Sequence, residues 1–158
     1  MAIDLDATLI LPKASIYAFP EDADAIIPTV YGTFLGAPFV HTDADDGGFL
    51  PATSIDRLNW VFAMNSKPIL AGQTPQVFVN DTLQDPSVYV FEPSYDYEGK
   101  GLIAALRFLV NPASRRISWR GSGTVDGVGA LISQPLNAIF DVFRLYGGWT
   151  LNDIDLPI

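Results

Sequence analysis

Short apolar runs separated by turn residues predict strands over most of the first 120 positions. Such runs cover residues 76–79, 87–92, 102–110 and 116–120. The first ends at Asn80-Asp81, a pair typical of tight turns, and the third is apolar apart from Arg107, which indicates a central strand. Regular short strands of this kind predict a mainly β fold, an antiparallel β-sandwich or barrel.

Two earlier segments are less regular. Residues 25–34 form a β-branched and aromatic run interrupted by Pro28, which indicates an edge strand or a bend. Residues 41–48 read His-Thr-Asp-Ala-Asp-Asp-Gly-Gly and predict a loop, because polar residues and glycines follow one another there.

One segment near the C-terminus changes to helical spacing and predicts an amphipathic helix over residues 133–146. Its apolar side consists of Leu136, Ile139, Phe140 and Phe143, and its polar side of Asn137, Asp141 and Arg144. Pro135 suits the first turn of a helix, and Gly147-Gly148 suits its end. We expect the apolar side to close the core of a single β-rich domain, residues 1–148.

The last ten residues, 149–158, form an apolar tail. Its large apolar residues are Trp149, Leu151, Ile154, Leu156 and Ile158. The tail either packs on its own domain or docks onto another subunit, and we take these five residues as the candidate subunit interface.

Composition agrees with one folded domain. The chain has 158 residues, of which 49% are hydrophobic and 17% charged, enough to bury a core of its own. The absence of cysteine excludes disulfides and thiolate metal sites. Acidic residues near the start and the shortness of every apolar run argue against a targeting segment and against membrane insertion.

The charge is acidic and unevenly placed. The net charge is −9, which repels phosphate backbones and predicts that the protein does not bind nucleic acid. Residues 1–56 carry nine acids and one base, Lys13, so that −8 of this charge lies in the first third. This part faces either solvent or a more basic partner.

The loop 41–48 holds the first candidates for chemistry. His41 is the single histidine, and the chain has no Gly-x-Ser-x-Gly elbow to accompany it. The acidic residues of the loop suit calcium, but the twelfth position counted from Asp43 is Ser54, where an EF-hand has glutamate. A solvated turn is the alternative.

A second group of candidates lies around residues 89–98. Glu92 and Glu98 are a possible carboxylate pair for glycoside hydrolysis. The aromatic residues nearby form either a sugar-stacking platform or half-buried strand positions; they are Tyr89, Phe91, Tyr95 and Tyr97. Since no catalytic motif supports them, we predict no enzyme activity, no catalytic residue, no cofactor and no bound metal.

Five phrases, in order along the chain, resemble a module of the tail-tip and baseplate proteins of tailed bacteriophages. They are Ile27-Pro-Thr-Val-Tyr-Gly32, Leu50-Pro51 with Ile55-Asp56, Phe62-Ala-Met-Asn-Ser-Lys-Pro-Ile69, Asp96-Tyr-Glu-Gly-Lys-Gly-Leu-Ile-Ala-Ala-Leu-Arg-Phe108, and Leu131-Ile132 with Pro135. The likeness covers roughly residues 26–155. Members of that family continue past the counterpart of Asp153-Ile-Asp155, so the resemblance implies a standalone version of one module. It supplies no active site.

The resemblance implies a structural component of a phage virion, in the tail or baseplate, that docks neighbouring subunits through protein–protein contacts. Its partners would be other virion structural proteins and further copies of itself in a symmetric homo-oligomer. Its location would be the virion, after synthesis in the host cytoplasm. The alternative is a receptor- or glycan-binding or capsid-decorating module. We expect truncation after Gly148 to leave a folded monomer that does not assemble.

Overall fold

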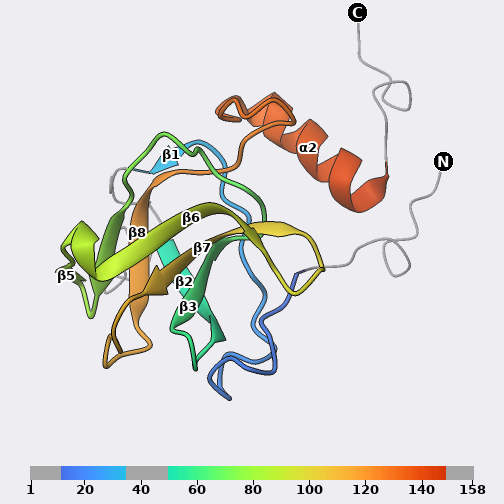
Figure 1. Ribbon diagram of the computed structural model, residues 1–158. Helices are drawn as coiled ribbons and strands as arrows, with labels where there is room; N and C mark the ends of the chain where they lie inside the picture. Colours follow the sequence, from blue (N-terminus) through green and yellow to red (C-terminus); the bar gives the residue numbers. More distant parts are fainter. Residues whose placement is uncertain (1–11, 35–49, 149–158) are drawn as a thin grey trace, which may run out of the picture.

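One antiparallel sheet of eight strands dominates the computed structural model, which describes residues 12–34 and 50–148 (Figure 1). The strands are β1 (Thr33–Phe34), β2 (Leu50–Asp56), β3 (Val61–Asn65), β4 (Gln76–Val79), β5 (Thr82–Leu83), β6 (Tyr89–Asp96), β7 (Leu102–Phe108) and β8 (Ile117–Ser122). Their order is β5-β4-β8-β2-β3-β7-β6, and β1 pairs with β8 beside this path. The sheet curls into half a barrel, which confirms the predicted mainly β, antiparallel fold with one C-terminal helix.

Local turn chemistry explains the clearest strands. Asn80 and Asp81 have φ angles of 47° and 63°, the left-handed pair that a two-residue hairpin between β4 and β5 requires. A 3-10 turn over Pro86–Val88, capped by the Asp85 side chain, leads into β6. β7 pairs with β3 on one side and β6 on the other, as the apolar run around Arg107 predicts.

Both sides of β3 are buried, and they belong to two separate apolar clusters. Phe62 and Met64 point into the larger cluster, where Trp119 is fully buried. Val61 and Ala63 point the other way, into a cluster that includes Ile27. Successive side chains of a strand alternate between its two sides, so β3 separates two cores.

The second cluster is covered by the irregular N-terminal segment rather than by another sheet. Ala14, Ala18 and Ile27 of this segment are buried there against β3 and β7. Pro28 interrupts the segment, and β1 is its one named strand in the described residues; its Ile26 makes an isolated bridge to Lys13. Residues 25–34, for which Pro28 predicts an edge strand or a bend, thus contribute the short strand β1 and part of the layer that covers this side of the sheet.

The helix α2 spans Pro135–Gly147, close to the predicted 133–146. Gln134 is its N-cap residue and Pro135 occupies the first turn, while Gly148 ends it in the left-handed conformation with φ of 64°. The N–H of Gly148 donates to the carbonyl oxygen of Phe143. Helix type and both ends therefore follow from local sequence.

The predicted role of the apolar side of α2 is wrong. Leu136, Ile139 and Phe143 are 56%, 50% and 39% exposed, and Phe140 is only partly buried, so these residues do not close the core. Figure 1 shows α2 at one end of the sheet rather than across it. The physical reason is that the sheet and the N-terminal segment already cover both sides of β3.

Candidate functional site

A polar contact holds α2 against the rest of the fold. Asp141 is buried, and its Oδ2 accepts a hydrogen bond of 2.9 Å from the hydroxyl of Tyr31. Its Oδ1 accepts a second hydrogen bond, also 2.9 Å, from Nη2 of Arg144. Because Asp141 lies on the predicted polar side, this contact turns the apolar side of the helix outward.

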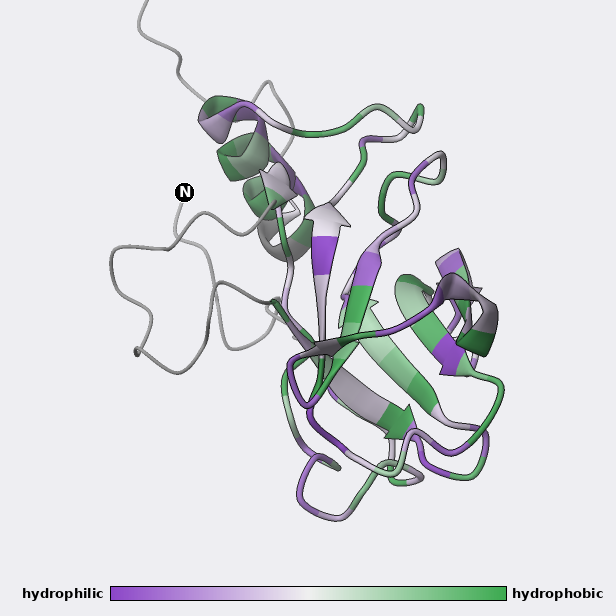
Figure 2. Ribbon diagram, turned by 90° about the vertical axis from the view of Figure 1, so that its left-hand side faces the viewer, coloured by the Kyte–Doolittle hydropathy of each residue, from purple (hydrophilic) through white to green (hydrophobic). Residues whose placement is uncertain are grey.

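The outward side forms an exposed apolar surface, which we call the outer face of α2. It comprises Leu136, Ile139 and Val142, which are 39% or more exposed. Figure 2 shows hydrophobic residues recurring along this helix, which stands apart from the sheet. A contiguous apolar surface of this kind is typical of a protein–protein contact.

Several predicted site residues lie outside the described residues. These are the candidate interface residues Trp149, Leu151, Ile154, Leu156 and Ile158, together with His41 and the rest of the loop 41–48. The tail interface therefore stays a prediction, and the two alternatives for the loop 41–48, a solvated turn and a calcium site, are not tested.

The tyrosines between 89 and 97 do not form a stacking platform. Tyr89 lies in the larger core cluster and donates to the carbonyl of Pro75, whereas Tyr97 lies in the second cluster. Both are buried, at 6% and 4% exposed. Of Tyr89, Tyr95 and Tyr97, only Tyr95 is partly exposed. The segment therefore offers no pair of tyrosine rings to a sugar.

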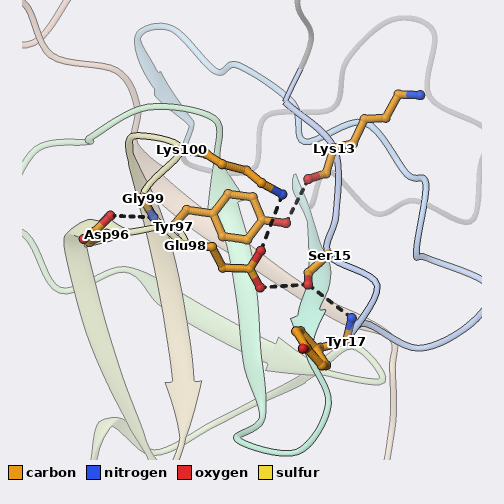
Figure 3. A network of polar contacts seen from close by, with 8 residues as sticks. All are labelled: Lys13, Ser15, Tyr17, Asp96, Tyr97, Glu98, Gly99 and Lys100. Atoms are coloured by element: carbon orange, nitrogen blue, oxygen red, sulfur yellow. Dashed lines mark hydrogen bonds and ion pairs between the residues drawn. The ribbon is translucent and has the colours of Figure 1, made fainter.

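The two candidate carboxylates have separate partners. Glu92 lies 3.3 Å from Nε of Arg107 on the neighbouring strand. Glu98 accepts a hydrogen bond of 2.9 Å from Ser15 and lies 3.4 Å from Nζ of Lys100 (Figure 3). Each carboxylate therefore serves as an anchor, Glu98 by joining the loop after β6 to the N-terminal segment.

A cleft of about 940 Å³ opens between this loop, the N-terminal segment and the end of α2. Its polar lining includes Lys13, Lys67, Lys100 and Tyr97, and its apolar lining includes Leu102 and Leu145. Lys67 is half-buried, whereas Lys13 and Lys100 are exposed. Three of the nine basic residues of the chain thus line one cleft.

The Tyr97 side chain supports one wall of the cleft. Its hydroxyl donates to the Lys13 carbonyl at 2.9 Å, and the Lys100 ammonium lies 5.4 Å from its ring centre (Figure 3). Burial raises the pKa of Tyr97 to about 12, and the nearby Glu98 carboxylate acts in the same direction.

The Lys67 side chain is partly withdrawn from water, which affects its charge. Partial burial lowers the pKa of its ammonium group; the Asp141 carboxylate opposes this shift and Arg144 adds to it. Neither Lys67 nor Lys13 has an ion-pair partner among residues 12–34 and 50–148. The cleft therefore favours a ligand with negative charge and apolar groups.

Sequence reasoning missed this cleft because its lysines are far apart in the chain. Pairing of β3 with β7 brings residues 67 and 100 together, and the hydrogen bond from Tyr97 to the Lys13 carbonyl adds Lys13; no spacing rule links the three. One local signal exists: each lysine has a proline or glycine beside it, as in Pro12-Lys13, Lys67-Pro68 and Gly99-Lys100-Gly101. Lys67 and Lys100 lie in bends near the ends of strands, where side chains converge, and Lys13 lies in the isolated bridge with Ile26.

Within the described part of the chain, no group of three or more His, Asp or Glu residues is placed to hold a metal ion. No helix of that part has the length and apolar content needed to span a membrane. Comparisons with models of protein families, with curated proteins and with solved structures find no match for this chain.

Proposed function

We propose that the protein is a structural component of a tailed-bacteriophage virion, in the tail or baseplate, and that the outer face of α2 docks a neighbouring copy. One observation carries the proposal: an amphipathic helix is held to its own domain by its polar side and presents its apolar side to the outside. The resemblance of the sequence to tail-tip and baseplate modules supplies the setting.

The architecture suits a mechanical role. Docking needs a stable body, and here the curled sheet and the N-terminal segment bury both sides of β3 without help from α2. The helix is then available for contacts with another subunit. A helix that presents the same apolar surface in every copy can repeat one contact around a ring.

The glycan-binding alternative has less support. It requires an exposed aromatic platform, and Tyr89 and Tyr97 are buried in different clusters. The docking role requires an exposed apolar surface, and the outer face of α2 supplies one. We therefore propose docking rather than glycan recognition.

Incorporation into phage particles tests the proposal. We expect the wild-type chain to co-purify with tailed particles, and the Leu136→Gln/Ile139→Gln variant to be lost from them at least about tenfold. Removal of a few half-exposed apolar side chains from an interface core costs more than the 1.4 kcal/mol that a tenfold change represents. The readout is quantitative mass spectrometry of purified particles.

Asn137→Gln is the matched control, because it changes an exposed residue of the same helix outside the outer face. Glutamine is a good helix former, so neither variant should melt α2. Absence of the wild-type chain from purified particles would contradict the virion assignment. Equal incorporation of both variants would contradict the docking role of the outer face.

A further inference from the structure

We propose that the lysine-lined cleft receives the acidic, apolar segment 149–158 of a neighbouring copy. This inference rests on the proposed function, since it names a second contact between the same subunits. The cleft is lined by the half-buried Lys67 and by the exposed Lys13 and Lys100.

Of the three lysines that line the cleft, only one forms an ion pair within the described residues. Lys100 is paired with Glu98, but Lys13 and Lys67 have no ion-pair partner in the described ranges 12–34 and 50–148. Half-burial disfavours the charged form of Lys67, and the Asp141 carboxylate, which is already bonded to Tyr31 and Arg144, opposes this only in part. A carboxylate beside Lys67 would offset that penalty, which makes an anionic occupant favourable.

The cleft is also apolar on two sides. Leu102 and Ile103 come from β7, and Leu145 comes from α2. Leu102 is 53% exposed and Leu145 is 38% exposed, so both would lose water contact when the cleft is filled. The occupant should therefore carry aliphatic side chains together with its negative charge.

Residues 149–158 combine negative charge with aliphatic side chains, and the two kinds of residue alternate along the segment. Asp153 and Asp155 are two positions apart, and so are Ile154, Leu156 and Ile158. In an extended segment, these sets point in opposite directions. One side can then reach the lysines while the other covers Leu102 and Leu145.

The position of α2 places the donor on another copy. Leu145 of α2 lines the cleft, and the same helix carries the outer face that the proposed function assigns to a neighbouring copy, which brings that copy close to the cleft. A neighbouring copy's segment can enter in extended form. The contact is then head-to-tail, with a segment of one copy in the cleft of the next.

Disulfide trapping tests this proposal, and the chain suits it because it has no cysteine. Leu102→Cys and tagged Leu156→Cys copies of the full chain are mixed and oxidised. Because a disulfide forms only when the two Cα atoms come within about 7 Å, we expect a mixed dimer of distinctive mass. Leu83→Cys is the matched control for Leu102→Cys, since Leu83 is equally exposed but lies on β5 at the far edge of the sheet.

A charge exchange tests the pairing itself. Adding Lys67→Glu to the Leu102→Cys copy should reduce the yield of mixed disulfide several-fold, and adding Asp153→Lys to the Leu156→Cys copy should restore it. Rescue of this kind reports an interaction between the two positions rather than a general loss of fold.

Three results would overturn the inference. One is the absence of mixed disulfide above the Leu83→Cys control. Another is a disulfide that forms only within one chain of a Leu102→Cys/Leu156→Cys double variant. That result would place residues 149–158 in the cleft of the same chain. The third is a disulfide between Leu102→Cys and Leu5→Cys without one between Leu102→Cys and Leu156→Cys. That result would assign the cleft to residues 1–11. Each of these three results contradicts the proposed contact at the cleft. The proposed function still stands in that case if phage particles contain the wild-type chain and lose the Leu136→Gln/Ile139→Gln variant.

Discussion

Asn65 shows how single buried residues join distant segments of this fold. Its Oδ1 accepts from the N–H of Val30 at 2.6 Å, and its Nδ2 donates to the hydroxyl of Thr124 at 3.0 Å. The Thr124 hydroxyl in turn donates to the carbonyl of Val30. A fully buried amide that satisfies several groups in this way fixes the position of the N-terminal segment on β3.

Gly123 lies at the same junction and leaves no room for a side chain. A Cβ atom there would lie 2.3 Å from the carbonyl oxygen of Val30, which is backbone and cannot rotate away. We expect Gly123→Ala to lower the free energy of unfolding by about 1 to 3 kcal/mol, the usual cost of overpacking. Urea denaturation measures this change.

Gly72→Ala is the control for Gly123→Ala. Nothing lies within 4 Å of a Cβ atom at Gly72, so this substitution should shift the free energy of unfolding by less than about 0.5 kcal/mol. Equal effects of the two substitutions would contradict the close approach between Gly123 and Val30.

Tyr97 predicts how stability depends on alkaline pH. Its pKa is raised to about 12 in the folded protein, against about 10 in an unfolded chain, so folding favours the neutral hydroxyl. This contribution is fully present below about pH 10 and is lost as the pH rises through about 12. The stability of the wild-type protein should therefore fall across this window.

Tyr97→Phe isolates that contribution. At neutral pH the variant should be less stable by about 1 kcal/mol, because the Lys13 carbonyl loses its hydrogen-bond donor. The difference should narrow as the pH rises above about 10. Urea denaturation of both proteins from neutral pH to about pH 11 is the measurement, and a constant difference would contradict the assigned role of the hydroxyl.

At the scale of elements, local patterns predict what each segment forms. Asn80-Asp81 predicts the turn that joins β4 and β5 in the structure, and Pro135 with Gly148 predicts the ends of α2. In each case the deciding interaction lies within a few residues. Side-chain periodicity and backbone conformation are properties of such short stretches, which is why they can be recognised in the sequence.

The orientation of α2 could not be predicted in the same way. Periodicity defines an apolar side but does not say what that side contacts. The helix is turned by the hydrogen bond between Tyr31 and Asp141, which are 110 positions apart. The cleft was missed for a similar reason, because the β3–β7 pairing and the Tyr97–Lys13 hydrogen bond bring Lys13, Lys67 and Lys100 to one place.

At the scale of the whole molecule, the protein combines a well-packed body with two surfaces that we propose bind neighbouring copies. The curled sheet and the N-terminal segment provide the body, and α2 offers its outer face on the far side from its attachment at Asp141. The cleft beside the same helix concentrates basic residues in a chain of net charge −9. Both surfaces meet at α2, which makes this helix the centre of the proposed assembly.

Light scattering of the isolated full chain at increasing concentration tests this central claim most directly. The account predicts that the wild-type mass rises from 17.2 kDa to a multiple of it, and that Asn137→Gln behaves in the same way. The Leu136→Gln/Ile139→Gln variant should stay at 17.2 kDa because its outer face has lost its two most exposed apolar side chains. A wild-type chain that stays monomeric throughout, or assembly that the double variant leaves unchanged, would contradict the account.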